Sequence, residues 1–268
     1  MTKSIKRCIL VKDSQRGKTA ESRETMSTLK SVVAGLTMIL LVVVGTYGAD
    51  VSFSTGLANR HVVGAGSVLH DDPVIQSDIF TSFENGFRID LWSSKSVNTE
   101  INANFGDELD LELGWSGMVK GFAVDIGLYY FDEPDIGTFG KYDVWYSHAK
   151  VARDIDQEVL GPVTVFVQYE NHITLPGTPY EGGSLFSVGS SANRTCGRMS
   201  MNVTESLIYD DGEFGSDQRF VAKFGMGLTW QVNDHLSVVA PQLTAWLPLT
   251  DTENHDPEAM VYVGVKLH

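Results

Sequence analysis

The chain has 268 residues, and its 26 Gly, 8 Pro, 13 Phe and 9 Tyr suit one all-β domain better than two small domains. A formal net charge of −14 argues against nucleic acid and against an anionic lipid surface as partners, and it favours cations. Charged residues are 20% of the chain, so no long apolar helix is hidden in its body.

The first predicted element is an apolar run at residues 32–44, which at 13 residues is shorter than the roughly 20 that a spanning helix needs. Lys30 precedes the run and small residues follow it, which is the order of a secretory signal peptide. We expect cleavage next to Gly48 or Ala49, so that residues 1–49 are an N-terminal extension and signal peptide, and residues 50–268 are the mature domain. An uncleaved membrane anchor is the alternative.

The segment before the apolar run is polar and basic, and a start at Met26 would give a signal peptide of ordinary length. We therefore give Cys8 no role. Residues 1–49 hold 8 of the 20 Lys and Arg and 3 of the 34 Asp and Glu, which leaves a mature domain with a net charge of −19. It has one cysteine, Cys196, so export brings no internal disulfide framework.

The mature domain begins with a predicted strand at residues 51–62, where apolar side chains occupy every second position. A loop over residues 63–73 leads to a second strand at 74–84. Asn85-Gly86 predicts a two-residue type I′ turn, because both central residues of that turn need a positive φ. A third strand at 87–93 then places Phe87, Ile89 and Leu91 on one face and Arg88, Asp90 and Trp92 on the other.

The clearest pattern is a β-hairpin between residues 109 and 130, with a tight connection at 116–121. Its apolar face carries Leu109, Leu111, Leu113 and Trp115, then Phe122, Val124, Ile126, Leu128 and Tyr130. The residues between them are mostly polar or small. In a soluble sandwich the apolar face would form a core, whereas in a membrane barrel it would meet lipid.

Seven further strands follow at residues 142–153, 163–170, 184–192, 198–209, 219–231, 235–247 and 259–268. In the strand at 142–153 the sequence leaves open which side chains form the apolar face. One set is Val144 and Tyr146, and the other is Trp145, Ala149 and Val151. The total is twelve strands, joined alternately by short turns and by longer loops richer in Asp, Glu, Gly and Pro.

This alternation predicts an all-β fold, a twelve-stranded antiparallel transmembrane β-barrel with short periplasmic turns and longer extracellular loops. A sandwich has no reason to sort its connections in this way. Strands of about 9 to 11 residues also suffice to cross a bilayer at a tilt. We expect outer-membrane lipid and lipopolysaccharide around the barrel, with aromatic girdles that include Trp115, Tyr130, Tyr169, Tyr209 and Trp230.

Several stretches resemble the bacterial TorF-type putative porin family: residues 72–76, 86–93, 108–117 and 125–130. The resemblance implies a single barrel in the outer membrane with a passive-diffusion role. Such barrels usually end on an aromatic residue that the barrel assembly machinery reads, whereas this chain ends Lys266-Leu267-His268. Either His268 replaces that aromatic residue, or the hydrophobic set ending at Leu267 serves.

If the apolar face meets lipid, the polar face lines a pore. The expected lining residues are Asp78, Arg88, Asp90, Asp110, Glu112, Asp125, Gln168, Glu170 and Lys223. Their excess of carboxylates would concentrate cations through the electric field and not through a tight site. The alternative is that Arg88 and Lys223 pair with neighbouring carboxylates and hold the lumen wall.

Acidic groups at residues 71–72, 132–135, 210–213 and 251–256 could hold divalent cations, but they have no EF-hand spacing, and solvated loop charge is the favoured interpretation. We expect no metal and no cofactor. No catalytic motif is present, so we expect no enzyme. The side chains of His70, His148, His172, His235 and His255 are interpreted as polar surface groups at loops or strand ends.

The predicted function is an outer-membrane channel for passive, cation-favouring diffusion of small hydrophilic solutes. The alternative is a non-conducting outer-membrane barrel, or a secreted β-domain, with a structural or binding role. A barrel hydrolase ranks third.

Overall fold

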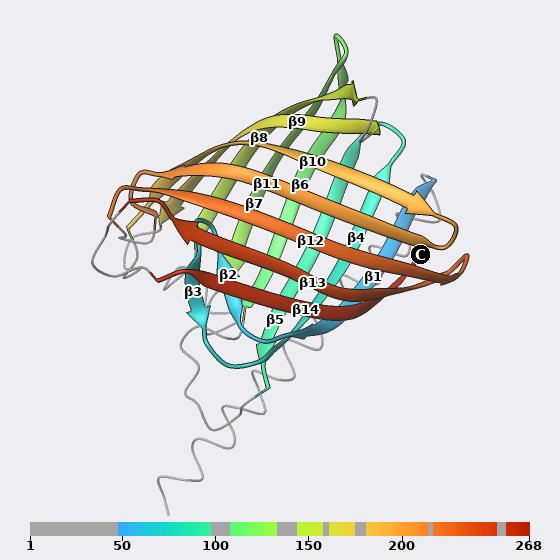
Figure 1. The fold of residues 1–268 in the computed structure, drawn as a ribbon, viewed down its shortest axis with the longest axis horizontal. Helices are drawn as coiled ribbons and strands as arrows, with labels where there is room; N and C mark the ends of the chain where they lie inside the picture. Colours follow the sequence, from blue (N-terminus) through green and yellow to red (C-terminus); the bar gives the residue numbers. More distant parts are fainter. Residues whose placement is uncertain are drawn as a thin grey trace, which may run out of the picture. The chain divides into compact units, whose positions relative to one another are not determined.

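The computed structural model describes residues 48–97, 108–132, 144–157, 161–174, 181–213, 217–250 and 256–268. Within it, residues Ala49–His268 form one compact unit (Figure 1). The predicted signal peptide lies outside the described residues. No helix in the described ranges is long and apolar enough to cross a membrane.

Twelve antiparallel strands form a closed barrel, which confirms the predicted fold class. Each strand pairs with its neighbour along the chain, and β1 pairs with both β4 and β14, so the sheet has no free edge. The barrel strands are β1 (Ala49–Ala58), β4 (Val74–Phe83), β5 (Phe87–Ser96), β6 (Glu108–Val119), β7 (Phe122–Asp132), β8 (Val144–Gln157), β9 (Gly161–Thr174), β10 (Gly183–Cys196), β11 (Met199–Asp210), β12 (Arg219–Asn233), β13 (Leu236–Pro248) and β14 (Glu258–Leu267).

The outer face of the barrel is apolar and the inner face is largely polar. Leu128, Phe224 and Val263 are 44%, 47% and 40% exposed, whereas Arg88 and Glu112 are buried. Some polar pairs also lie on the outer face; for example, Ser190 donates a hydrogen bond to Glu205, and Ser184 donates one to Asn171. An apolar exterior around a polar interior is the reverse of a soluble protein and is the pattern of barrels that lie in lipid.

Aromatic side chains form a continuous row across four neighbouring strands near the longer connections. Tyr169 on β9 is paired in register with Phe186 on β10, Phe186 with Tyr209 on β11, and Tyr209 with Phe220 on β12. The rings of Tyr209 and Phe220 are 5.0 Å apart. Aromatic rows of this kind occur where a barrel leaves the bilayer core.

The short turns lie at the same end as both termini of the barrel unit, to the right in Figure 1. Lys120 and Gly121 have φ values of 51° and 83°, which makes their two-residue loop a type I′ turn. The type I′ prediction for Asn85-Gly86 is wrong, because only Gly86 has a positive φ. The amide of Gly86 donates to Phe83 O at 2.9 Å, so the loop has three residues and Gly86 takes the left-handed position.

The predicted strand over residues 51–62 is also corrected. β1 ends at Ala58, and the chain then forms a separate two-stranded hairpin from β2 (His61–Val63) and β3 (Ser67–His70), which we call the inner hairpin. It replaces most of the loop predicted at residues 63–73. It lies at the end of the barrel that carries the longer connections (Figure 1).

Other strands run further than the pattern predicted. β9 continues to Thr174 and β10 to Cys196, beyond the predicted strand ends at residues 170 and 192. Polar side chains are tolerated at these positions because the inner face is polar. The open face assignment of β8 is settled: Val144 and Tyr146 are buried inside, and Trp145 faces outward.

Candidate functional site in the barrel lumen

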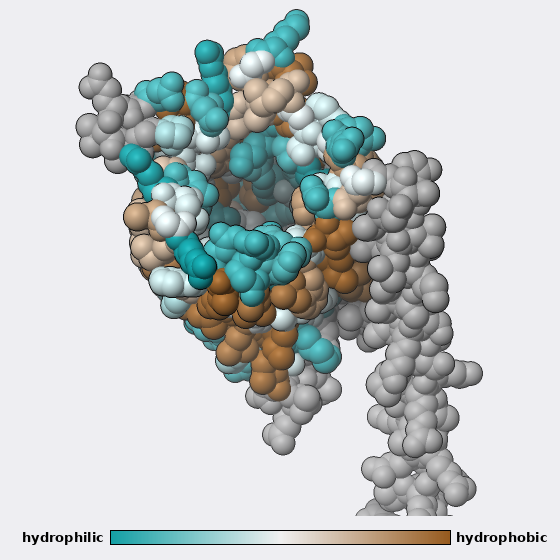
Figure 2. All heavy atoms as spheres, turned by 90° about the vertical axis from the view of Figure 1, so that its right-hand side faces the viewer, coloured by the Kyte–Doolittle hydropathy of each residue, from teal (hydrophilic) through white to brown (hydrophobic). Residues whose placement is uncertain are grey.

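A cavity of about 710 Å³ occupies the lumen. Its lining comes from β4 to β9 and includes Phe80, Arg88, Glu112, Tyr146 and Thr164. Figure 2 shows the barrel from the end with the short turns, where the surface is hollowed and hydrophilic side chains lie inside the opening. The lumen is therefore open toward this end.

Arg88 is the centre of an ion-pair cluster on the lumen wall. Its Nη1 donates to Asp125 Oδ2 at 2.6 Å, and its Nη2 donates to Asp125 Oδ1 at 3.0 Å and to Glu112. His148 Nε2 lies 2.6 Å from the same Asp125 Oδ1. Gly114 provides the space, since a Cβ atom there would come within 2.7 Å of Arg88 Cζ. The guanidinium fork thus holds β5, β6 and β7 together by charge-assisted hydrogen bonds.

The other predicted pore residues gather in smaller groups. The carboxyl groups of Asp90 on β5 and Asp78 on β4 are neighbours on the lumen wall. Gln168 donates to Glu170 on the same strand. Asp110 is buried, and Lys223 Nζ lies 5.2 Å from the ring centre of Trp246 on β13. Arg88, Glu112 and Asp125 therefore come together, whereas Lys223 stands on the opposite wall.

The inner hairpin packs against the inside of the barrel wall. Val62 and Ala65 join a buried apolar cluster with four inward side chains from four successive strands, Leu185, Ile208, Val221 and Trp246. On three of these strands the adjacent residues Phe186, Leu207 and Leu247 face outward. An apolar patch on the inner wall is unusual for a water-filled barrel, and the hairpin covers it.

Polar contacts fix the hairpin in this place. Trp246 Nε1 donates to Gly64 O at 3.2 Å, and Arg219 Nη2 donates to Ser67 Oγ at 3.4 Å. Arg219 is itself held by Asp210, with Nε 3.0 Å from Oδ2, and both side chains are buried. Gly64 has a φ of +50°, and a Cβ atom there would lie 2.0 Å from Glu213 Oε2. Only glycine suits this position.

Several acidic and histidine residues that we expected in solvent are buried. Asp210 and Glu213, expected as solvated loop charge, are both 0% exposed because the hairpin covers them. His70 and His172 are buried as well, and the His148 side chain is 7% exposed. His235 is exposed as expected, and His255 lies outside the described residues. Among the described side chains, no group of three or more His, Cys, Asp or Glu could hold a metal ion.

The burial of His61 predicts a pH-dependent stability. Burial, and secondarily the neighbouring His70, lower the pKa of His61 from 6.5 to about 4. The unfolded chain therefore takes up this proton first as the pH falls, and the free energy of unfolding decreases between about pH 6.5 and pH 4, by up to about 3 kcal/mol. Urea titrations of the detergent-solubilised barrel at pH 7 and pH 5 measure the loss. The variant His61→Gln should remove this part of it, and His235→Gln should not. Equal losses in both variants would contradict the assignment.

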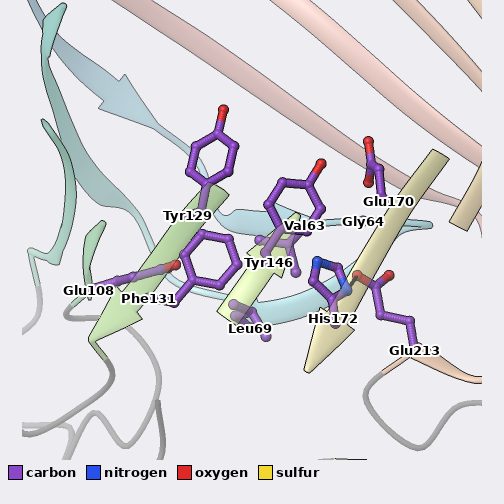
Figure 3. Close-up of a pocket in the computed structure, with 10 residues that line it drawn as sticks. All are labelled: Val63, Gly64, Leu69, Glu108, Tyr129, Phe131, Tyr146, Glu170, His172 and Glu213. Atoms are coloured by element: carbon purple, nitrogen blue, oxygen red, sulfur yellow. Dashed lines mark ion pairs between the residues drawn. The ribbon is translucent and has the colours of Figure 1, made fainter. Parts of the chain in front are cut away.

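A second, smaller cavity of about 220 Å³ lies between the inner hairpin and the wall formed by β6 to β9 (Figure 3). The hairpin contributes Val63, Gly64 and Leu69, and the wall contributes Glu108, Tyr129, Phe131, Tyr146, Glu170 and His172, with Glu213 from the connection after β11. Tyr129 and Tyr146 also line the larger cavity, so the two cavities are neighbours.

A closed antiparallel barrel with an apolar exterior and a polar lumen defines a protein of the outer-membrane barrel class. The chain belongs to the Gcw_chp family of bacterial proteins of unknown function, whose family model matches residues 45–255. No curated protein matches the chain.

Solved structures share the fold at low sequence identity. A NanC porin is 7% identical with a TM-score of 0.50, covering 82% of this chain and 100% of its own. A bacterial polysaccharide outer membrane secretin is 10% identical with a TM-score of 0.48, covering 82% of this chain and 97% of its own. The translocator domain of the autotransporter NalP from Neisseria meningitidis is 11% identical with a TM-score of 0.46, covering 94% and 98%. At these identities the likeness to the NanC porin concerns the fold alone.

Proposed function

We propose that the protein is an outer-membrane channel that lets small hydrophilic solutes diffuse passively and favours cations. The observation that carries the proposal is the lumen cavity of about 710 Å³, lined in part by charged side chains, inside an apolar exterior. The proposal includes export through the predicted signal peptide, insertion by the barrel assembly machinery and kinship with the TorF-type putative porins.

The charges of the lumen support cation preference. Most of the ionisable side chains described above that face the lumen are acidic, including Asp78, Asp110, Glu112 and Glu170. Arg88 is neutralised by two of its neighbours, Glu112 and Asp125. Carboxylates in a low-dielectric wall raise the local concentration of cations and exclude anions.

The second candidate is a barrel that does not conduct. The inner hairpin favours it, because the hairpin fills part of the lumen at the end with the longer connections. In that case the protein would have a structural or binding role.

Reconstitution in planar bilayers tests the proposal. We expect discrete channel events and, in a KCl gradient, a reversal potential of the sign that cation flow produces. The double variant Asp78→Asn with Asp90→Asn should reduce this potential, whereas the exposed-turn variant Asp234→Asn should leave it unchanged. Anion preference would contradict the proposed selectivity, and a complete absence of events would favour the non-conducting barrel.

The membrane location predicts a depth-dependent cost for charge on the outer face. Leu128 lies near the middle of β7 and is 44% exposed, and Leu247 lies near the end of β13 and is 40% exposed. Leu128→Arg should lower the free energy of unfolding in lipid by about 2–4 kcal/mol, and Leu247→Arg by at most about 1 kcal/mol. Urea titration in liposomes measures both. Equal costs would count against a bilayer around this face.

A further inference from the structure

We infer that the smaller cavity is a binding site for a small organic cation with an ammonium group. The inference deepens the proposed function, because it names a class of solute for the channel. It rests on the shape of the cavity, its aromatic lining and its carboxylates.

The cavity has the size and access of a site for a ligand smaller than a drug molecule. Its volume is about 220 Å³, whereas sites for drug-sized ligands begin at roughly 300 Å³. It adjoins the lumen cavity at Tyr129 and Tyr146, and the lumen is hollowed at the end with the short turns. A solute can therefore approach from that end, while the inner hairpin closes the other side.

Aromatic rings form one wall of the cavity (Figure 3). Phe131 and Tyr146 stack with ring centres 5.8 Å apart at an interplanar angle of 20°, and Tyr146 lies 4.6 Å from the ring of His172. The hydroxyl groups of Tyr129 and Tyr146 are occupied by Glu112 and Glu170. The rings are thus held in place, and their π faces are the surface that attracts an ammonium group.

Carboxylates stand around these rings. Glu108 and Glu170 line the cavity on β6 and β9, and Glu213 closes it from the connection after β11. Lys and Arg are absent from the lining among the described residues, although Lys223 interacts with Glu170 and Glu213 from β12. The basic groups beside these three carboxylates are Lys223, His172 and His61, whose Nδ1 lies 3.5 Å from Glu108 Oε2.

The second observation that indicates a ligand is one oxygen of Glu213. The side chain is 0% exposed, and one carboxylate oxygen pairs with His172. The other, Oε2, lies against Gly64 at the cavity wall and accepts no hydrogen bond from any described residue. A buried carboxylate oxygen without a partner is costly, and a bound cation would satisfy it.

Calorimetry on the folded barrel in a maltoside detergent, which has no ammonium group, tests the inference. The probes are choline and 3,3-dimethylbutanol, which has the same shape without the charge. We expect saturable choline binding and no comparable binding of the alcohol. Tyr146→Leu and Glu170→Gln should each weaken choline binding about tenfold. Phe166→Leu is the matched control, since Phe166 packs under Lys150 outside this cavity, and it should bind choline like the unaltered protein.

The inference is overturned if both probes bind alike, or if Tyr146→Leu and Glu170→Gln both bind choline as well as Phe166→Leu does. The heat-modifiable gel mobility of each variant establishes that it is folded. Calorimetry measures binding independently of conduction, so a failure of the binding site can be distinguished from a failure of the proposed channel. Choline binding by a barrel that gives no channel events would remove the proposed channel and keep this site. Channel events without choline binding would do the reverse.

Discussion

Removal of the inner hairpin should raise the single-channel conductance several-fold. In the variant, Gly-Gly replaces residues 62–69 and joins His61 to His70, which are paired in register. The hairpin buries Val62 and Ala65 against the inner wall and occupies the lumen end near the longer connections. Ionic current is limited by the narrowest cross-section, so its removal widens the pore. Single-channel recordings in planar bilayers measure the change.

Two single substitutions complement the deletion, one that weakens the docking of the hairpin and one that serves as a control. Trp246→Leu removes the hydrogen bond to Gly64 O and part of the packing on Val62 and Ala65, so it should give noisier, partly opened channels. Val68→Thr, at a hairpin side chain that is 36% exposed, should leave the conductance unchanged. If the hairpin deletion conducts no better than the unaltered protein, the hairpin is not the constriction.

Replacement of Arg88 should be the most destabilising single change in the lumen wall. Arg88→Met leaves Glu112, whose side chain is 3% exposed, without its counter-charge, and it also removes one of the two partners of Asp125 and leaves His148 as the other. Breaking a buried ion pair on one side costs about 3–5 kcal/mol. We expect the lower part of that range, because Asp125 is 35% exposed and partly solvated. Urea titration of the barrel in detergent, followed by Trp fluorescence, measures the loss.

A second variant separates charge from packing. Arg88→Met combined with Glu112→Gln and Asp125→Asn should recover much of the lost stability, because no uncompensated buried charge remains. Arg198→Met, at an exposed turn where Nη1 donates to Val232 O at 3.2 Å, should cost no more than about 1 kcal/mol. If Arg88→Met is no worse than Arg198→Met, the cluster does not stabilise the barrel.

The barrel itself could be predicted because its signals are local. Alternation of apolar and polar residues fixes the face of each strand, and it correctly placed Arg88, Glu112 and Asp125 on one face of neighbouring strands. Counting the alternating segments gave twelve strands, and the order of short turns and longer loops then predicted that they form a transmembrane barrel. His172 could also have been found, since it continues the inward series of Gln168 and Glu170 by one more step.

The inner hairpin could not be predicted in the same way. Its strands have three and four residues, too few to show a period, and its contacts are remote in sequence: Gly64 and Trp246 are 182 positions apart. One signal was present, since Val62, Val63, Val68 and Leu69 are too apolar for a solvated loop. The burial of His148 was not predicted because the sequence left the face assignment of β8 undecided. The burial of Glu213 was not predicted because only the hairpin covers it.

The position of the hairpin in the chain has a consequence for biogenesis. It is tethered between β1 and β4, yet the apolar surface that receives it belongs to β10, β11, β12 and β13. That surface does not exist until the C-terminal half of the sheet is in place. The hairpin therefore docks only after most of the barrel has assembled, and a nascent barrel passes through a wider stage before its own N-terminal segment narrows it.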